Sequence, residues 1–193
     1  MRSPVADLLA DLSSAFAASQ VDWYLFGAQA AIVYGVARLT ADVDVTVRTP
    51  DRLPIASLVE SLERSGFLQR IPDPVFAAQS RVLPFVHQAT RLPVDVVLAG
   101  PGIEDEFLAR ARRHVIDGVD VPVVDVTDLI VMKVLAGRPK DLEDVVTLLR
   151  VQETAVDTRR TLHLLQMLES ALAQSDLLPA FEQALARAGS KAK

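Results

Sequence analysis

The hydrophobic pattern of this 193-residue chain changes character once, near residue 126. Before that point, short apolar runs typical of strands alternate with stretches of helical spacing. After it only helical stretches follow, and Gly137-Arg138-Pro139 separates two of them. We therefore predict an α/β (α+β) core in residues 1–126, a helical C-terminal region in 127–188 and a tail in 189–193.

Within the core, individual elements follow from spacing, caps and breakers. Helices are predicted over 3–16, 28–36, 51–64 and 103–113. Strands are predicted over 23–26, 41–47, 81–86, 93–98 and 121–124 and near Val115, with proline-containing loops elsewhere between 67 and 99.

Composition excludes several classes of function. The chain has no cysteine, which rules out disulfides, thiolate zinc sites and cysteine nucleophiles. Residues 1–20 are interrupted by Asp7 and Asp11, so we expect neither a secretory signal nor a membrane span, and we expect a cytoplasmic protein. With 25 acidic against 20 basic residues, the overall field does not attract a polynucleotide, which would need a local basic groove.

Two carboxylates stand two positions apart in the alternating segment 41–47. On a strand, Asp42 and Asp44 would leave the same face, about 6.6 Å apart along the backbone. Carboxylates that converge from one face suit a hard divalent cation that also binds phosphates. The alternative is the solvated face of an edge strand, and for the pair alone it is the stronger interpretation.

Asp95 changes that balance because valines flank it in the segment 93–98. An ionised carboxylate in an apolar strand is costly unless a cation accompanies it. It is therefore the candidate third ligand of a two-metal site, in which the ions lie about 3.5–4 Å apart. Pro93 leaves open that this segment is an edge strand.

The run Gly27-Ala28-Gln29-Ala30-Ala31, followed by Arg38-Leu39-Thr40-Ala41-Asp42-Val43-Asp44, resembles the nucleotidyltransferase superfamily that includes DNA polymerase beta. The chain is most similar to the minimal, AbiEii-type (MenT-like) branch of bacterial toxin–antitoxin systems. That branch has glycines or Gly-Ser opening a helix, an Arg-x-Thr-x-Asp-x-Asp strand, a third acid and a later lysine helix. The matching residues here are Gly27, Arg38, Thr40, Asp42, Asp44, Asp95 and Lys133.

The resemblance implies a mixed sheet flanked by helices and a magnesium-dependent enzyme. It would move an NMP from an NTP, ATP included, to an acceptor hydroxyl, which in the toxin branch can be the 3′ end of tRNA. Two Mg²⁺ ions, or Mn²⁺ in their place, would bind Asp42, Asp44 and Asp95. A cognate antitoxin would be a protein partner, and from the sequence we expect no membrane partner.

The same resemblance assigns a set of residues to nucleotide binding, and it gives one of them, Lys133, a catalytic role as well. Its members are Gly27, Ala28, Arg38, Thr40, Lys133, Arg138 and Asp141. Ala28 departs from the family, which usually has Gly or Ser at this position, and a serine hydroxyl there would help to hold the terminal phosphate. This departure supports an alternative, a catalytically weak nucleotide sensor or partner-binding module. A second alternative is the same chemistry on a small molecule or a protein hydroxyl.

The basic residues also have structural explanations. Lys133, in an apolar helix, needs an anionic partner if buried, or else its apolar stem covers the surface while its head reaches solvent. Arg138 can pair with Asp141, and Lys140 with Asp144, as ordinary surface contacts. Arg38 either clamps a triphosphate or holds Asp42.

Overall fold

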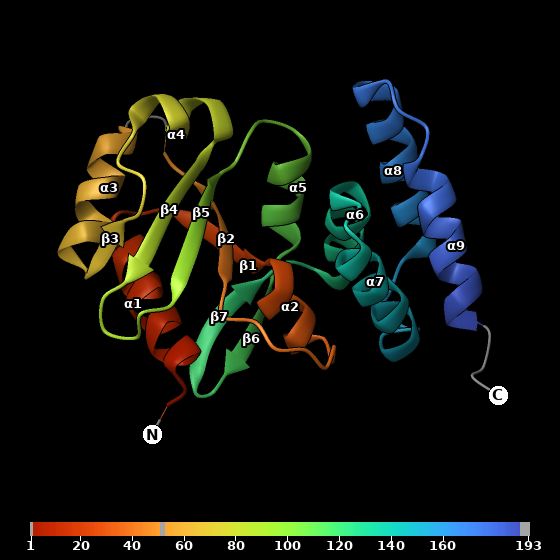
Figure 1. The fold of residues 1–193 in the computed structure, drawn as a ribbon, viewed down its shortest axis with the longest axis horizontal. Helices are drawn as coiled ribbons and strands as arrows, with labels where there is room; N and C mark the ends of the chain where they lie inside the picture. The colour runs from red at the N-terminus through yellow and green to blue at the C-terminus, as the bar shows by residue number, and fades with distance from the viewer. Residues whose placement is uncertain (1, 51–52, 190–193) are drawn as a thin grey trace. The chain divides into compact units, whose positions relative to one another are not determined.

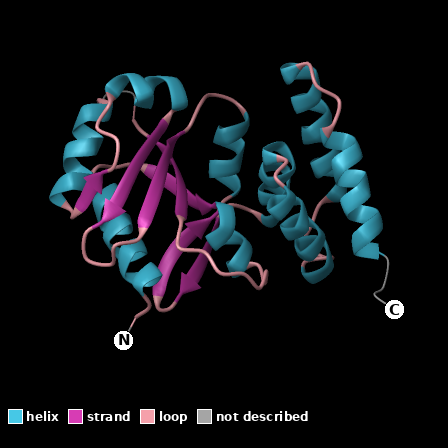
Figure 2. Cartoon of the chain, viewed as in Figure 1, coloured by secondary structure: helices cyan, strands magenta, loops and turns pink. Residues whose placement is uncertain are grey.

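The computed structural model describes residues 2–50 and 53–189. The helices among these residues are α1 (Pro4–Ala18), α2 (Gly27–Val33), α3 (Ile55–Arg64), α4 (Pro74–Ser80), α5 (Ile103–Arg110), α6 (Val126–Ala136), α7 (Pro139–Val151), α8 (Thr158–Leu172) and α9 (Leu177–Gly189). The strands are β1 (Asp22–Phe26), β2 (Val43–Arg48), β3 (Phe67–Gln69), β4 (Val82–His87), β5 (Pro93–Leu98), β6 (Arg112–Ile116) and β7 (Val119–Val123). Figures 1 and 2 show these elements along the chain.

The contacts between residues divide the chain into two compact units. Unit 1 comprises Met1–Gln29 and Leu39–Val124, and unit 2 comprises Ala30–Arg38 and Asp125–Lys193. The predicted boundary after residue 126 kept residues 30–38 in the core, whereas the contacts group them with the helical unit.

Unit 1 is built on one mixed sheet with the strand order β3-β4-β5-β2-β1-β7-β6 (Figure 1). The β2–β5 and β1–β7 pairs are parallel, and the other neighbouring pairs are antiparallel. The fold is thus the predicted mixed sheet flanked by helices, and β2 and β5 are neighbours in its interior.

The two faces of the sheet differ in burial. Val43, Val45 and Val47 of β2 are at most 1% exposed, and Val94 and Val96 of β5 are equally buried. The alternate residues of both strands are mostly only half-buried. Because side chains alternate across a strand, one face carries the core and the other is available for a site.

Helix α1 packs on β1, β7 and α3. The Ser3 side chain accepts a hydrogen bond from the backbone N–H of Ala6, and Pro4 opens the first turn. Both are typical features of a helix N-terminus. Leu8, Leu9 and Leu12 are fully buried, so this predicted amphipathic helix is confirmed.

Unit 2 is helical. Helix α6 contacts α7, α8 and α9, and α9 contacts α7 and α8. Gly137 ends α6 in the left-handed conformation at φ +64°, and Pro139 opens α7, as the Gly-Arg-Pro break predicts. Within residues 2–50 and 53–189, no helix combines the length and the apolar character that crossing a membrane requires.

Several predicted boundaries were wrong. Strand β3 and helix α4 lie where only loops were expected, because Pro74, taken as a loop residue, opens a helix capped by the Asp73 side chain. Helix α5 ends at Arg110, and strand β6 begins at Arg112.

Two predictions extend beyond the described residues. The predicted helix 51–64 begins at Ile55, and positions 51–52 lie outside the described part of the chain. Gly189, the first residue of the predicted tail, closes α9, while 190–193 lie outside the described part.

Candidate active site

Two of the predicted carboxylates face the same way from neighbouring strands. Asp44 of β2 is the register partner of Asp95 of β5 in a parallel pair. Register partners project from the same face of a sheet, with their Cβ atoms about 5 Å apart. Both residues are half-buried. The strand spacing therefore brings these two acids together, as the sequence interpretation required.

Both strands lie in the interior of the sheet, so the edge-strand alternatives are wrong. Strand β2 pairs with β1 and β5, and β5 pairs with β2 and β4. Pro93 is compatible with this position because it is the first residue of its strand.

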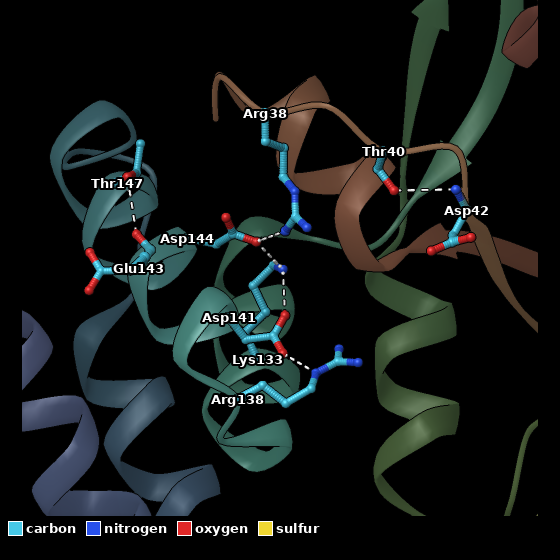
Figure 3. Close-up of polar contacts among 9 residues, drawn as sticks. All are labelled: Arg38, Thr40, Asp42, Lys133, Arg138, Asp141, Glu143, Asp144 and Thr147. Atoms are coloured by element: carbon cyan, nitrogen blue, oxygen red, sulfur yellow. Dashed lines mark hydrogen bonds and ion pairs between the residues drawn. The ribbon is translucent and has the colours of Figure 1, made fainter.

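Asp42 does not lie on the strand as predicted. Strand β2 begins at Val43, and Asp42 is exposed in the loop before it. Its backbone N–H donates a 3.2 Å hydrogen bond to the Thr40 hydroxyl (Figure 3). This contact gives Thr40 a role in shaping the loop that carries Asp42.

Gly27 lies directly against the Asp44 carboxylate. A Cβ built on Gly27 would stand 2.1 Å from Asp44 Oδ2, and the φ of Gly27 is +69°. Any other residue would thus meet both a steric clash and an unfavourable backbone conformation. The sequence suggested a backbone approach to phosphate at Gly27, and the structure shows a backbone approach to a carboxylate. Ala28 follows in α2.

Asp95 has a cationic partner that the sequence did not indicate. The Arg70 guanidinium forms an ion pair with Asp95 Oδ1, and the two side chains are 42% and 41% exposed. Arg70 Nε also donates a 3.0 Å hydrogen bond to the Phe85 carbonyl.

The carboxylates suit a hard divalent cation by ligand type, since Mg²⁺ prefers oxygen and binds proteins through one or two carboxylates plus substrate phosphates. Asp44 and Asp95 provide such oxygens from one face. Within residues 2–50 and 53–189, no group of three or more His, Cys, Asp or Glu side chains is gathered closely enough to hold an ion. Of the three predicted ligands, the structure therefore brings Asp44 and Asp95 into register.

The remaining candidates form a charged cluster in unit 2. Lys133 of α6 is 3% exposed, and its Nζ lies 2.6 Å from Asp144 Oδ2 and 3.3 Å from Asp141 Oδ1 (Figure 3). The alternative in which Lys133 reaches solvent is therefore wrong. The anionic partners that its burial demands come from α7.

Two arginines complete this cluster. Arg38 Nη1 lies 2.5 Å from Asp144 Oδ2, and Arg138 Nε pairs with Asp141 Oδ2. The expected Arg138–Asp141 contact is confirmed, but the partners of Asp144 are Lys133 and Arg38 rather than the expected Lys140.

The pKa of Asp141 lies below its ordinary value. Burial acts to raise the pKa, but the hydrogen bond from Arg138 and the charge of Lys133 outweigh it. Asp141 is therefore held in its charged form.

Sequence reasoning gave Asp144 only a surface contact with Lys140, and it missed Arg70. A signal for Asp144 was present, because it follows Asp141 by three positions on one helix and so shares its face. For Arg70 there was none, since its contact with Asp95 depends on the pairing of β3, a strand of three residues that was not predicted.

Comparisons with known proteins agree on the fold. No curated protein matches the chain in sequence. An antigenic nucleotidyltransferase-like protein from Paracoccidioides brasiliensis superposes with a TM-score of 0.63 at 18% identity, covering 100% of this chain and 96% of that one. The antibiotic-resistance factor ANT(2'')-Ia gives 0.62 at 16% identity, covering 90% and 95%. The lincosamide antibiotic adenylyltransferase LnuA, in its lincomycin-bound structure, gives 0.50 at 12%, covering 72% and 93%.

Family membership rests on the sequence itself. A family model described as nucleotidyltransferase of unknown function (DUF6036) matches residues 6–177, which is most of the chain. The chain therefore belongs to this nucleotidyltransferase family.

Proposed function

We propose that this nucleotidyltransferase uses Mg²⁺, held by Asp44, Asp95 and Asp42, to move an NMP from an NTP to an acceptor hydroxyl. The observation that carries the proposal is the register of Asp44 and Asp95 on interior strands of one sheet. The backbone of Gly27 against Asp44 supports it, because it fixes where that carboxylate lies.

In the transfer, a bond forms between the acceptor oxygen and the α-phosphorus, and the bond from that phosphorus to the pyrophosphate oxygen breaks. The family resemblance implies two Mg²⁺ ions, for which Mn²⁺ could substitute. When bound, such ions would neutralise the charge that develops during the transfer. We assign to Asp95 the additional role of receiving the proton of the acceptor hydroxyl, since its half-exposed carboxylate is accessible.

The cluster of unit 2 is assigned to the phosphates. Arg38 and Lys133 contact Asp144, and Arg138 contacts Asp141, so the cluster gathers three basic side chains of the kind that bind phosphate. A guanidinium matches phosphate bidentately, and an ammonium binds it as a point charge. Asp141 orients Lys133 in this scheme. Gly27, Ala28 and Thr40 complete the predicted nucleotide-binding set.

We propose RNA as the acceptor, with the 3′ end of tRNA as the specific case. Support comes from the order of Arg38, Thr40, Asp42, Asp44, Asp95 and Lys133 along the chain, which resembles the AbiEii-type toxins. The corresponding partner would be an antitoxin protein, and the compartment the cytoplasm.

A small-molecule or protein hydroxyl is the second candidate acceptor. The net charge of −5 favours it, because the field of the whole chain repels a polynucleotide. ANT(2'')-Ia and LnuA are named for antibiotics, but at 16% and 12% identity their likeness extends to the fold alone.

The test incubates the protein with each α-labelled NTP, Mg²⁺ and total RNA, with an EDTA-treated sample alongside. The proposal expects label in RNA with one or more NTPs, pyrophosphate in equal amount, and neither after chelation. Label on a small molecule or a protein would show that the acceptor is the second candidate and not RNA. Calorimetric binding of Mg²⁺-NTP without pyrophosphate release in any mixture would contradict the transfer reaction and support the sensor that Ala28 suggests.

A further inference from the structure

Arg70 lies in the same row of the sheet as the two candidate metal ligands. Its backbone N–H donates a 2.8 Å hydrogen bond to the Pro84 carbonyl, which continues the β3–β4 pairing by one residue beyond Gln69. Pro84 is the register partner of Asp95, and Asp95 that of Asp44. Residues in one row project from one face. Pro84 thus stands between Arg70 and Asp95 in this row, and the long Arg70 side chain reaches Asp95 past it.

The guanidinium of Arg70 is held at two points. Its terminal nitrogen pairs with Asp95 Oδ1, and its Nε donates to the Phe85 carbonyl. The backbone bond to Pro84 fixes the base of the side chain as well. An arginine tied down in this way loses little further freedom when it pairs with a carboxylate, so Arg70 is held beside Asp95 although both side chains are partly exposed.

A guanidinium and a divalent cation compete for the same carboxylate oxygens. Each neutralises Asp95, and each requires a lone pair on Oδ1 or Oδ2. A free cation that binds Asp95 Oδ2 therefore meets the like charge of Arg70 close by, and one that takes Oδ1 displaces Arg70 and leaves its charge without an anion. A cation that arrives on a nucleotide brings phosphate oxygens, which are good acceptors for the released guanidinium.

We propose that Arg70 is a positioning residue that occupies Asp95 before substrate binds and so weakens the binding of free divalent cations. This inference rests on the proposed metal-binding role of Asp44 and Asp95. The carboxylates bind the metal, whereas Arg70 controls when they can do so. Arg70 selects the metal–nucleotide complex over the metal alone.

The test measures the dissociation constant of Mn²⁺ by electron paramagnetic resonance, which counts free ions, without nucleotide. The proteins are wild type, R70Q, D95N and the double variant R70Q/D95N. We expect R70Q to bind Mn²⁺ about two- to fivefold more tightly than wild type, as an ion pair of this exposure implies. The gain should vanish in the D95N background, because it acts through Asp95.

Two controls separate competition from other effects. R113Q removes an arginine from another exposed ion pair of the same unit, that with Asp120, and should leave the Mn²⁺ constant unchanged. R70K retains the charge without the planar fork, and its constant should fall between those of wild type and R70Q. Thermal unfolding verifies that each variant is folded, and R70K carries the test should R70Q fail to fold.

An unchanged constant in R70Q, or an equal gain with and without Asp95, would overturn the role of Arg70. D44N distinguishes this failure from that of the proposed function. If Mn²⁺ binding depends on Asp44 but not on Arg70, the metal centre stands and the inference is wrong. If neither wild type nor any variant binds Mn²⁺, the metal centre itself is wrong, and the inference fails with it.

Discussion

Two charged groups of this molecule, one in each unit, differ in how deeply the protein buries them. In unit 2, Lys133, Asp141 and Asp144 are 3–6% exposed and lie within one network of ion pairs. In unit 1, the Asp95 side chain is 41% exposed, and Asp42 is exposed on a loop.

Because the unit 2 cluster is the more deeply buried of the two, we expect the fold to depend on it. A buried charge that loses its partner is strongly destabilising, whereas a half-exposed carboxylate can turn to water. We therefore expect substitutions in the unit 2 cluster to affect stability first. Substitutions among the unit 1 carboxylates should affect activity first.

The largest stability effect should come from D144A. It removes the carboxylate that both Lys133 and Arg38 contact, and leaves Lys133 buried with Asp141 at 3.3 Å. Breaking a buried pair in this way costs about 3–5 kcal/mol. Urea unfolding at pH 7 measures the loss.

Glu143 provides the matched control on the same helix. It pairs with Arg187 at 2.7 Å, but the two side chains are 63% and 46% exposed. E143A should cost no more than about 1 kcal/mol. Equal losses of unfolding free energy in D144A and E143A would show that the buried ion pairs of the cluster contribute no more than an exposed pair.

The next effect concerns Gly27 and separates backbone conformation from contact with Asp44. G27A places a Cβ against Asp44 Oδ2 at φ +69°, whereas G118A, at φ +83° in the β6–β7 turn, meets no atom within 4 Å. Both variants should lose about 1–2 kcal/mol of stability from the left-handed backbone.

Nucleotide transfer should distinguish these two variants. Only G27A displaces a candidate metal ligand, and a misplacement of about 1 Å can cost about 100-fold in rate. Assays of both proteins at equal folded concentration provide the comparison. Similar transfer activities in G27A and G118A would contradict a role for Asp44 in the reaction.

The same two groups show what the sequence could predict. The alternation around Asp44 and the valines around Asp95 were enough to place both acids on strands, because side-chain period and burial are local properties. The partners of these acids depend on register. Arg70 reaches Asp95 through pairing across three strands, which no local pattern encodes. Lys133 was predicted to need an anion only if buried, and both its burial and its contact with Asp144 follow from helix packing.

A pH series tests the lowered pKa of Asp141. Above the pKa of an unfolded aspartate, about 3.9, the carboxylate is charged in both states and its ion pairs contribute fully. As pH falls towards the lower folded-state pKa, the unfolded chain takes up the proton first and this stabilisation is lost. The stability advantage of wild type over D141N should therefore be constant from pH 7 to 5 and shrink below about pH 4.

Urea unfolding of both proteins at pH 7, 5, 4 and 3 provides this measurement. A stability difference between wild type and D141N that stays constant down to pH 3 would contradict the lowered pKa.

The smallest effect should come from Thr40, on the loop that carries Asp42. T40V removes the hydroxyl that accepts the 3.2 Å hydrogen bond from the Asp42 N–H, whereas T40S retains it. A hydrogen bond of this kind contributes about 0.5–1.5 kcal/mol, so the transfer rate should fall about two- to tenfold in T40V only. Rates measured over a range of Mg²⁺ concentrations test this, and equal rates in T40V and T40S would exclude the hydroxyl from shaping the site.

The most direct test of the account compares D44A with D22A in pyrophosphate release and urea unfolding. Asp22 is an exposed acid on strand β1 of the same sheet, four positions before Phe26, the register partner of Asp44. We expect D44A to unfold within about 1 kcal/mol of wild type and to lose transfer by at least about 100-fold, with D22A active. Pyrophosphate release by folded D44A at the wild-type rate would contradict a metal centre at Asp44.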